Sequence, residues 1–378
     1  MKIFIIDIIG SHSGMHYYDR SFRNILLREY KNVIIISNYS DKENCAIRLF
    51  KDYYSGNTIS KIFKVLASFF RYFFFIIKNR SQSFIFLTFG NFYELIFIFP
   101  LLFTGNLIID AHELYPLDCE LKRKSRLKFR LIKYLYKHYI KTIIFHSAKT
   151  GQALDKFGYS QKRLFIPHFS YDLQCAAING EISVEVKSLF SESRINVLFF
   201  GNIRMSKGVD ILLDIAYKCN RNSFKNKINF IIAGNDPHKL TEQLLKKYKS
   251  EFPVSVLLRY INDEELGFIF GNCDYVFLPY RKISQSGVME MAIRFRKPVI
   301  TSDLQYFKEI LEMFPSFGYL CKSNDYEEYL KLFKKIIELN GRDDKEKFYT
   351  ESDLEKFNGF KDPENFLNEL GNVLSQVL

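Results

Sequence analysis

The chain has 378 residues, of which 47% are hydrophobic, so it is long and apolar enough for two domain cores. Its net charge of +12 comes from the first half, where residues 1–172 hold 26 Lys and Arg against 13 Asp and Glu. This excess predicts an anionic surface or polymer as a partner, but not nucleic acid, because the sequence contains no recognition module. The six widely spaced cysteines exclude a cysteine-based metal site and are typical of reduced thiols in a cytosolic protein.

Short apolar runs bounded by polar turns alternate with helical patterns along almost the whole chain. Such runs are typical of parallel strands covered on both faces, and their alternation with helices indicates right-handed βαβ units. Six runs fall in each half of the chain, at residues 2–9, 33–37, 83–89, 106–112, 142–147, 164–168, 195–201, 228–234, 254–260, 275–280, 297–302 and 318–322. The sequence therefore predicts the α/β class, with two doubly wound, Rossmann-like domains that face a central cleft.

The alternation of strands and helices breaks between residues 170 and 194. We therefore predict an N-terminal domain over residues 1–175 and a C-terminal domain over residues 190–360. A helical pattern in residues 361–378 closes the chain.

The first strand is followed by a turn that contains Gly10 and Gly14. This turn lacks the G-x-G-x-x-G spacing of a dinucleotide-dependent oxidoreductase. It is either a plain connection between a strand and a helix or a loop that approaches phosphate. We expect no secretory signal, because Asp7 interrupts the apolar start and no basic segment precedes it.

Two segments of the N-terminal half combine apolar and basic residues. Residues 61–80 form a Phe-rich helical pattern with five cations, and residues 121–141 hold nine Lys and Arg and no acid. Both patterns suit contact with anionic lipid at a membrane surface. The alternatives are a buried core helix for the first segment and a solvated basic face for the second. Two apolar runs, residues 62–77 and 84–108, are also too interrupted to be clean membrane spans. The first contains Lys64 and Arg71, and the second contains Glu94 and Pro100 and divides into a strand, a helix and a strand.

His112 and Glu113 directly follow the predicted strand at 106–112. Ligands of open parallel sheets bind at the carboxyl ends of the strands, so both residues are candidates for catalysis. A histidine there can hold a sugar or exchange a proton near neutral pH. The alternative is a structural histidine at the end of a strand.

Two polar clusters follow strands in the C-terminal half. In the first, Arg204 and Lys207 precede a helix start, where free N–H groups and the helix dipole favour a diphosphate. In the second, Ser284, Ser286 and Gly287 open another helix, with Ser286 as a predicted N-cap. Each cluster alone could be an ordinary turn with surface polar residues.

Taken in order, the motifs of this half resemble glycosyltransferase family 4, which has the GT-B fold. They read FFGNIRMSKGVDIL, IIAGN, RYINDEEL, CDYVFLPY, SQSGV and KPVITSD, within residues 199–303. The resemblance implies that Arg204 and Lys207 hold the donor diphosphate and that the serines and Gly287 meet phosphate or sugar. It also places Tyr260, Ile261 and Asn262 near the nucleotide base, and Gly14 near the donor phosphates.

One departure concerns the Glu-x7-Glu pair that many members carry. Its two positions are Ile283 and Met291 here, and Glu290 lies one residue away from the second. Glu290 is therefore either a catalytic acid or a helix-surface acid. The sequence contains no Asp-x-Asp motif, so we expect phosphate to be neutralised without a divalent metal and without a cofactor.

The resemblance implies a retaining glycosyltransferase that uses a UDP- or GDP-linked sugar. Its expected acceptor is a glycan, which the basic surface suggests is lipid-linked, in surface polysaccharide synthesis. We expect a cytoplasmic protein that is peripheral on the inner membrane face. The alternatives are a sugar-nucleotide epimerase or hydrolase of the same fold and a non-catalytic nucleotide-binding membrane protein.

Overall fold

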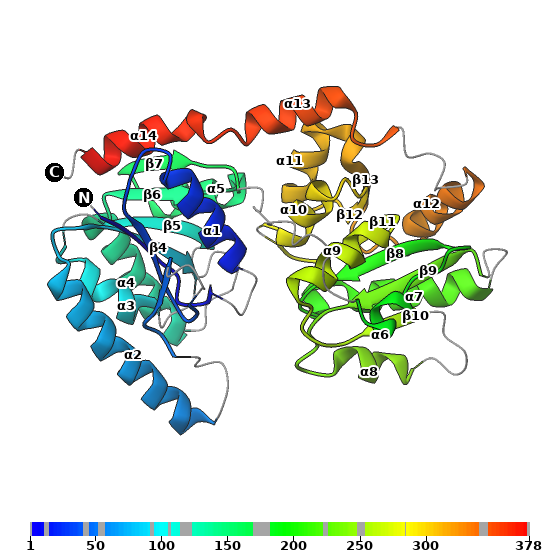
Figure 1. Ribbon diagram of the computed structural model, residues 1–378, viewed down its shortest axis with the longest axis horizontal. Coiled ribbons are helices and arrows are strands. Elements are labelled where there is room, and N and C mark those ends of the chain that lie inside the picture. Colours follow the sequence, from blue (N-terminus) through cyan, green and yellow to red (C-terminus); the bar gives the residue numbers. More distant parts are fainter. Residues whose placement is uncertain are drawn as a thin grey trace. The chain divides into compact units, whose positions relative to one another are not determined.

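The computed structural model divides the chain into two compact units (Figure 1). Unit 1 comprises Met1–Asp172 and Lys361–Leu378, and unit 2 comprises Leu173–Phe360. Each unit is described below by itself. The structure describes residues 2–10, 15–40, 45–51, 57–90, 94–104, 107–113, 123–168, 182–221, 226–247, 254–283, 285–339 and 347–375.

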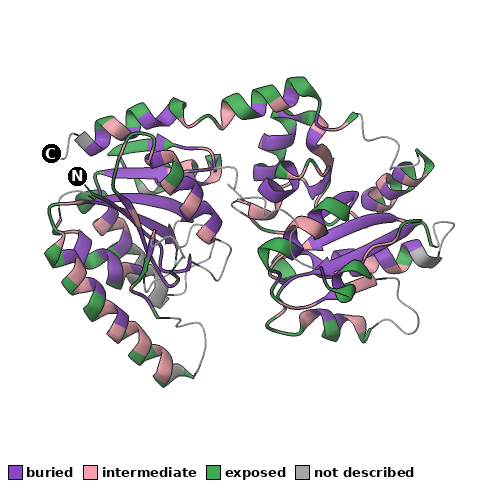
Figure 2. Ribbon diagram, viewed as in Figure 1, coloured by how far each residue is buried: buried purple, intermediate pink, exposed green. Residues whose placement is uncertain are grey.

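Unit 1 is built on a seven-stranded parallel sheet with the order β3-β2-β1-β4-β5-β6-β7. The strands are β1 (Ile3–Ile6), β2 (Val33–Ser37), β3 (Ala46–Arg48), β4 (Ser83–Phe89), β5 (Leu107–Glu113), β6 (Thr142–Phe145) and β7 (Lys162–Phe165). Most positions of β1, β4 and β5 are buried on both faces, as continuous apolar runs predict (Figure 2). The strand order reverses between β1 and β4, which is the pattern of a doubly wound sheet.

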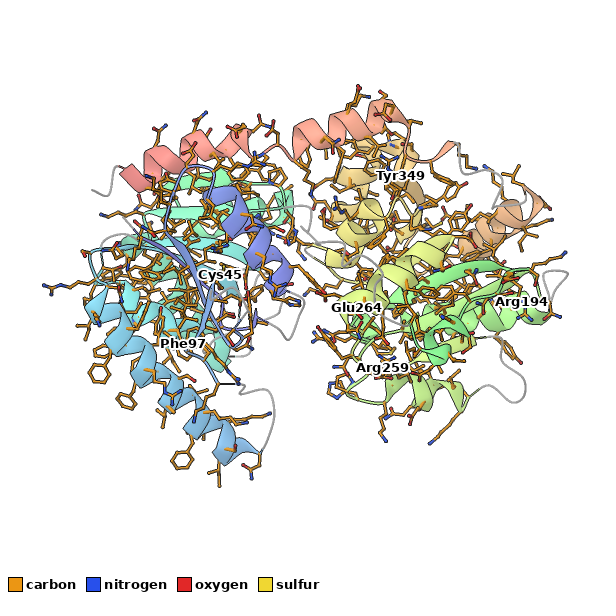
Figure 3. All side chains as sticks on the ribbon, in the orientation of Figure 1. Cys45, Phe97, Arg194, Arg259, Glu264 and Tyr349 are labelled. Atoms are coloured by element: carbon orange, nitrogen blue, oxygen red, sulfur yellow. The ribbon has the colours of Figure 1, made fainter. Side chains whose placement is uncertain are left out.

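Helices cover both faces of this sheet. They are α1 (Met15–Leu26), α2 (Thr58–Lys78), α3 (Glu94–Leu101), α4 (Arg123–Tyr139), α5 (Ala148–Phe157) and α14 (Glu364–Ser375). Side chains of α2, α3, α4 and α5 share one core with the sheet, and Phe97 of α3 is completely buried in it (Figure 3). The chain terminus returns to unit 1, where Arg28 and Glu364 form an exposed ion pair.

Unit 2 repeats this plan with a six-stranded sheet of order β10-β9-β8-β11-β12-β13. Its strands are β8 (Ile195–Phe200), β9 (Ile228–Ala233), β10 (Val254–Leu257), β11 (Tyr275–Leu278), β12 (Val299–Ser302) and β13 (Gly318–Cys321). Its helices are α6 (Val184–Lys187), α7 (Val209–Arg221), α8 (Leu240–Leu245), α9 (Asp263–Asn272), α10 (Gly287–Arg294), α11 (Gln305–Met313), α12 (Tyr326–Glu338) and α13 (Glu351–Phe360), and η2 (Met205–Lys207) and η3 (Pro315–Phe317) are short 3-10 turns. The strand order reverses between β8 and β11.

The predicted class and the two doubly wound sheets are confirmed. Each of the twelve apolar runs contains or overlaps a strand, and the run from 84 to 108 divides into β4, α3 and β5. The sequence analysis missed β3, whose three residues are too short for a periodic pattern to mark. Within the described part of the chain, no helix has the length and apolar character that crossing a membrane requires.

Candidate functional site

The two polar clusters of unit 2 follow neighbouring strands. β8 and β11 pair in parallel, with Tyr275 opposite Val197 and Val276 opposite Leu198. The strand order reverses between these two strands, and doubly wound sheets bind ligands in the crevice at such a point. The topology therefore brings the clusters together although about 80 residues separate them in sequence.

The first cluster lies in the turn from Gly201 to Gly208, between β8 and α7. Gly208 has a φ of 75°, and a Cβ at this position would lie 2.1 Å from the Pro279 carbonyl oxygen of the second cluster's turn. Only glycine allows the two turns to approach so closely. The close approach of the two backbones thus explains why glycine follows Lys207 in the motif.

The first cluster contains two cations in the same turn. Arg204 is exposed, and Lys207 is half-buried with its ammonium enclosed, 5.4 Å from the centre of the Tyr280 ring. The ammonium also lies 3.0 Å from where a Cβ on Gly201 would be. Burial, and secondarily the charge of Arg204, lower the pKa of Lys207 to about 8. An anion beside both cations would relieve this unfavourable arrangement.

The second cluster opens α10 at the same place. Ser286 is the N-cap, and its hydroxyl accepts a hydrogen bond from the Met289 N–H at 3.2 Å. Gly287 is the first helical residue, and Val288 lies 3.4 Å from the Cβ position of Gly201. Ser284 lies outside the described residues. The start of α10 and the ammonium of Lys207 therefore both border Gly201.

Arg281 ties the two clusters to each other. Its guanidinium donates to both carboxylate oxygens of Asp210, at 2.6 and 2.7 Å, and to the Met205 carbonyl at 2.9 Å. Its backbone N–H donates to the Ser206 carbonyl at 2.8 Å. The sequence analysis missed this residue, because only the fold shows that Asp210 at the start of α7 faces the turn after β11.

The three predicted base-binding residues lie together between β10 and α9. Tyr260 is exposed, and Ile261 is buried. Asn262 is the N-cap of α9 and forms a capping box with Glu265. Glu265 also holds Arg259 through two hydrogen bonds of 2.7 and 2.8 Å. The turn is thus rigidly held, with Tyr260 as its accessible ring.

Glu290 is almost completely buried, which excludes the alternative of a helix-surface acid. It lies in the first turn of α10, and one carboxylate oxygen accepts a hydrogen bond from the Tyr306 hydroxyl at 3.3 Å. A buried acid needs such partners, and a carboxylate in the first turn also suits the helix dipole.

In unit 1, β5 ends with His112 buried and Glu113 exposed. The ring of His112 stacks on Phe89 with centroids 5.1 Å apart and lies 4.5 Å from Tyr18. Gly14 lies outside the described residues. The buried, ring-packed position of His112 supports the alternative that it is a structural histidine. Glu113, in contrast, is accessible to solvent.

His112 borders a buried pair that the sequence analysis did not identify. The Nε2 atom of His146 lies 2.5 Å from a carboxylate oxygen of Asp110, and its Nδ1 atom lies 2.7 Å from the Ile166 carbonyl. Both nitrogens therefore face acceptors, so the pair needs a proton on each nitrogen or on Asp110. Despite complete burial, the nearby His146 and His112 lower the pKa of Asp110, which favours the carboxylate form of Asp110.

Asp110, His112 and His146 are residue types that can bind a metal ion together. Among the described residues, ligand atoms of Asp110, His112 and His146 lie within 4.8 Å of one another. Ligands of one zinc ion, each about 2.0–2.2 Å from it, are usually at least 3 Å apart. The shorter distance between Asp110 and His146 fits a hydrogen bond. The Tyr18 hydroxyl donates to the other oxygen of Asp110 at 2.7 Å.

Two buried acids, Asp7 and Asp19, lie in the region that follows β1. Asp7 accepts hydrogen bonds from the N–H groups of Ile9 and Gly10 at 2.8 and 2.9 Å. Asp19 of α1 lies near Asp7 and accepts a hydrogen bond from the Tyr39 hydroxyl at 2.9 Å. Burial raises the pKa of Asp7 to about 6 and raises that of Asp19 well above its ordinary value. The two carboxyls therefore share a proton near neutral pH.

Comparison with known proteins finds a family match over the part of the chain that contains the unit 2 clusters. Residues 183–352 match the family model described as glycosyl transferases group 1. A GDP-mannose:glycolipid 4-beta-D-mannosyltransferase from Xanthomonas campestris pv. campestris is 30% identical over 105 residues. That stretch covers 28% of this chain and only 29% of the relative.

Solved structures show the same fold over the whole chain. Sucrose-phosphate synthase from Thermosynechococcus elongatus superposes with a TM-score of 0.74 at 14% identity, covering 100% of this chain and 99% of that one. HepE from Anabaena, in complex with UDP-glucose, superposes with a TM-score of 0.71 at 14% identity, covering 100% of both chains. The chain therefore has the GT-B fold, and its residues 183–352 are similar to the group 1 glycosyl transferases.

Proposed function

We propose that this protein is a glycosyltransferase that moves a hexose from a nucleoside diphosphate sugar to a glycan acceptor. The donor diphosphate binds in unit 2 where the turn after β8 meets the start of α10. The acceptor is a lipid-linked glycan, in surface polysaccharide synthesis. The enzyme works at the cytoplasmic face of the membrane as a peripheral protein.

One observation carries the proposal. The enclosed ammonium of Lys207 and Val288 in the first turn of α10 both border the Cβ position of Gly201, and the charge of Arg204 in the same turn lowers the pKa of Lys207. An enclosed cation beside another cation is unfavourable until an anion joins them. Phosphate oxygens suit this place, because they accept charge-assisted hydrogen bonds and interact with free N–H groups at the helix end.

The same groups supply the electrostatic part of catalysis. Negative charge grows on the diphosphate as it leaves the sugar, and fixed donors stabilise that charge without reorganisation. We assign this role to Arg204, Lys207 and the first turn of α10, including Ser286 and Gly287. We also assign Gly14 and Ser284 to the donor phosphates by the resemblance to family 4.

The remaining assignments follow the same resemblance. Tyr260, Ile261 and Asn262 lie at the base, where the exposed ring of Tyr260 offers a stacking surface. His112, Glu113 and Glu290 are the candidates for contact with the reacting sugar. Among these three, only Glu113 is exposed in this structure. We therefore place it first for mutagenesis.

The comparisons support the donor and acceptor classes. The Xanthomonas relative is named for GDP-mannose and a glycolipid, and the HepE structure contains UDP-glucose. Both donors present a diphosphate to the protein. The donor screen therefore starts with UDP- and GDP-linked hexoses.

Family 4 implies that the product keeps the anomeric configuration of the donor. The relative is named for a β-linked mannoside, which is the inverted product of an α-linked GDP-mannose donor. The configuration of the new linkage, measured by NMR, therefore decides between retention and inversion. We also propose that no divalent metal takes part in donor binding. Transfer that is lost in a chelator and restored by manganese would refute this part of the proposal.

The experiment that tests the function is a donor screen in two steps. Binding of UDP, GDP, ADP and CMP is measured first, and we expect one diphosphate to bind best. The matching sugar nucleotide is then incubated with and without membrane lipid extract. Transfer that requires the extract supports the proposal. Turnover without any acceptor would indicate an epimerase or hydrolase, and binding without turnover would indicate a non-catalytic protein.

A further inference from the structure

Helix α2 of unit 1 has apolar residues on two opposite faces. Ser68, Tyr72 and Ile76 are buried against the sheet and α3. The opposite face carries seven large apolar residues that are between 47% and 68% exposed: Ile59, Ile62, Phe63, Leu66, Phe70, Phe74 and Ile77. In Figure 3, ring side chains project from the side of α2 that faces away from the sheet.

The exposed residues follow helical spacing and form one stripe along the 21 residues of α2. Residues three and four positions apart lie on the same face of a helix, so the stripe runs the length of α2. α3 packs beside α2, with the rings of Tyr72 and Phe97 5.7 Å apart. α3 and the turn after it add Ile96, Phe99 and Phe103, which are 42%, 54% and 73% exposed.

All the charged side chains of α2 are basic. α2 contains Lys61, Lys64, Arg71 and Lys78 and no acidic residue. The one acid of α3, Glu94, is buried and accepts hydrogen bonds from Thr88 and from the Phe89 N–H. The surface therefore presents exposed aromatic and aliphatic side chains with cations beside them and no exposed acid on these two helices.

This combination corrects the first alternative considered for residues 61–80. A buried core helix would hide its apolar residues, whereas α2 exposes one complete face. A monomeric soluble protein rarely exposes a continuous apolar surface of this kind. An apolar, uncharged protein partner would give these cations no opposite charge to interact with. A surface with fixed negative charge would attract them.

We propose that the outer face of α2, continued by α3, inserts in the plane of an anionic bilayer, with the phenylalanines among the acyl chains. The cations then lie at the level of the phosphate groups, as in other in-plane amphipathic helices. Lys and Arg near such a surface attract anionic lipid, and their alkyl chains reach outward to the headgroups. The proposal rests on the peripheral location proposed above but not on glycosyl transfer.

The test is flotation of the full chain with vesicles of phosphatidylcholine, with and without about one-third phosphatidylglycerol. We expect binding to the mixed vesicles and at least about tenfold weaker binding when Phe63, Phe70 and Phe74 are all changed to Ser. Changing Lys61, Arg71 and Lys78 to Gln should remove the preference for anionic vesicles.

Matched controls lie in unit 2. Three exposed apolar residues, Val184, Met313 and Leu339, are 81%, 41% and 46% exposed, and their change to Ser should leave binding unchanged. Equal binding of the Phe variant and the wild type, with both proteins folded by circular dichroism, would overturn the proposal.

The oligomeric state provides a second decisive measurement. A wild-type dimer in solution that the Phe variant converts to a monomer, with no vesicle binding by either, would assign the stripe to a protein interface and overturn the membrane proposal. If vesicles bind but no sugar is transferred, the proposed function fails and the membrane surface stands.

Discussion

Arg281 and Asp210 form a two-pronged ion pair, with N–O distances of 2.6 and 2.7 Å, that joins the turn after β11 to the start of α7. The pair is only partly exposed, at 30% and 18% of the two side chains. It lies between two elements that carry the proposed phosphate contacts. We therefore predict that Arg281→Ala weakens binding of the preferred nucleoside diphosphate about tenfold, which calorimetry would detect.

The control for this prediction is Arg281→Lys, which keeps the charge but cannot bind both carboxylate oxygens in a planar fork. We expect an intermediate affinity for this variant. An affinity of Arg281→Ala equal to that of the wild type would show that the pair does not position the phosphate site.

The enclosed ammonium of Lys207 predicts how donor binding depends on pH. Its pKa of about 8 in the free protein means that the ammonium loses its proton as pH rises above that value. If phosphate binds the charged form, the dissociation constant should rise about thirtyfold between pH 7 and pH 9.5. Arginine keeps its charge in this range, so Lys207→Arg should flatten the profile. A wild-type profile that is flat up to pH 9.5 would contradict the role of Lys207.

The shared proton of Asp7 and Asp19 predicts a stabilising substitution. A carboxyl whose pKa is raised on folding destabilises the folded state once pH rises through the raised pKa. Asn at position 19 could donate to Asp7 and still accept from Tyr39 without needing that proton. We expect Asp19→Asn to raise the Tm by a few °C at pH 8, and less as pH falls towards 5.

Asp7→Asn is the matched control for this substitution. Both oxygens of Asp7 accept backbone hydrogen bonds, so an amide nitrogen there loses one of them. We expect this variant to be less stable than the wild type at every pH. A lower Tm for Asp19→Asn at pH 8 would contradict the shared proton.

The buried pair of Asp110 and His146 predicts a large loss of stability. Both side chains are completely buried, so His146→Ala leaves the carboxylate of Asp110 without the ring that hydrogen-bonds to it. We expect the free energy of unfolding to fall by about 3–5 kcal/mol in urea titrations. The double variant Asp110→Asn with His146→Gln also removes the buried carboxylate and should recover part of the loss. A loss below about 1 kcal/mol for His146→Ala would indicate that Asp110 is neutral.

The sequence predicted the two sheets because buried parallel strands are continuous apolar runs that glycine and polar turns delimit. It also predicted that Arg204, Lys207 and Ser286 follow strand ends, and the structure places them after the neighbouring strands β8 and β11. It did not predict the contacts that hold this region. Arg281 and Asp210 are far apart in the chain, and only the order of the strands brings them together.

The interpretation of single side chains was less successful. Nothing in the local sequence shows that His112 is buried beside Asp110 and His146, since His146 comes from the next strand. A helix that is apolar all round normally predicts burial, but α2 is apolar on two faces and only one is covered. The exposed apolar face of α2 is therefore a result of the structure and not of the sequence pattern.

The most direct test of the account is nucleotide binding by a variant with Arg204→Ala and Lys207→Ala. Arg204 is exposed and Lys207 half-buried, so the fold should tolerate both changes, which circular dichroism would verify. Losing two charge-assisted contacts should weaken binding of UDP or GDP at least about a hundredfold. Unchanged affinity of the folded double variant, measured by calorimetry at pH 7, would contradict the proposed diphosphate site.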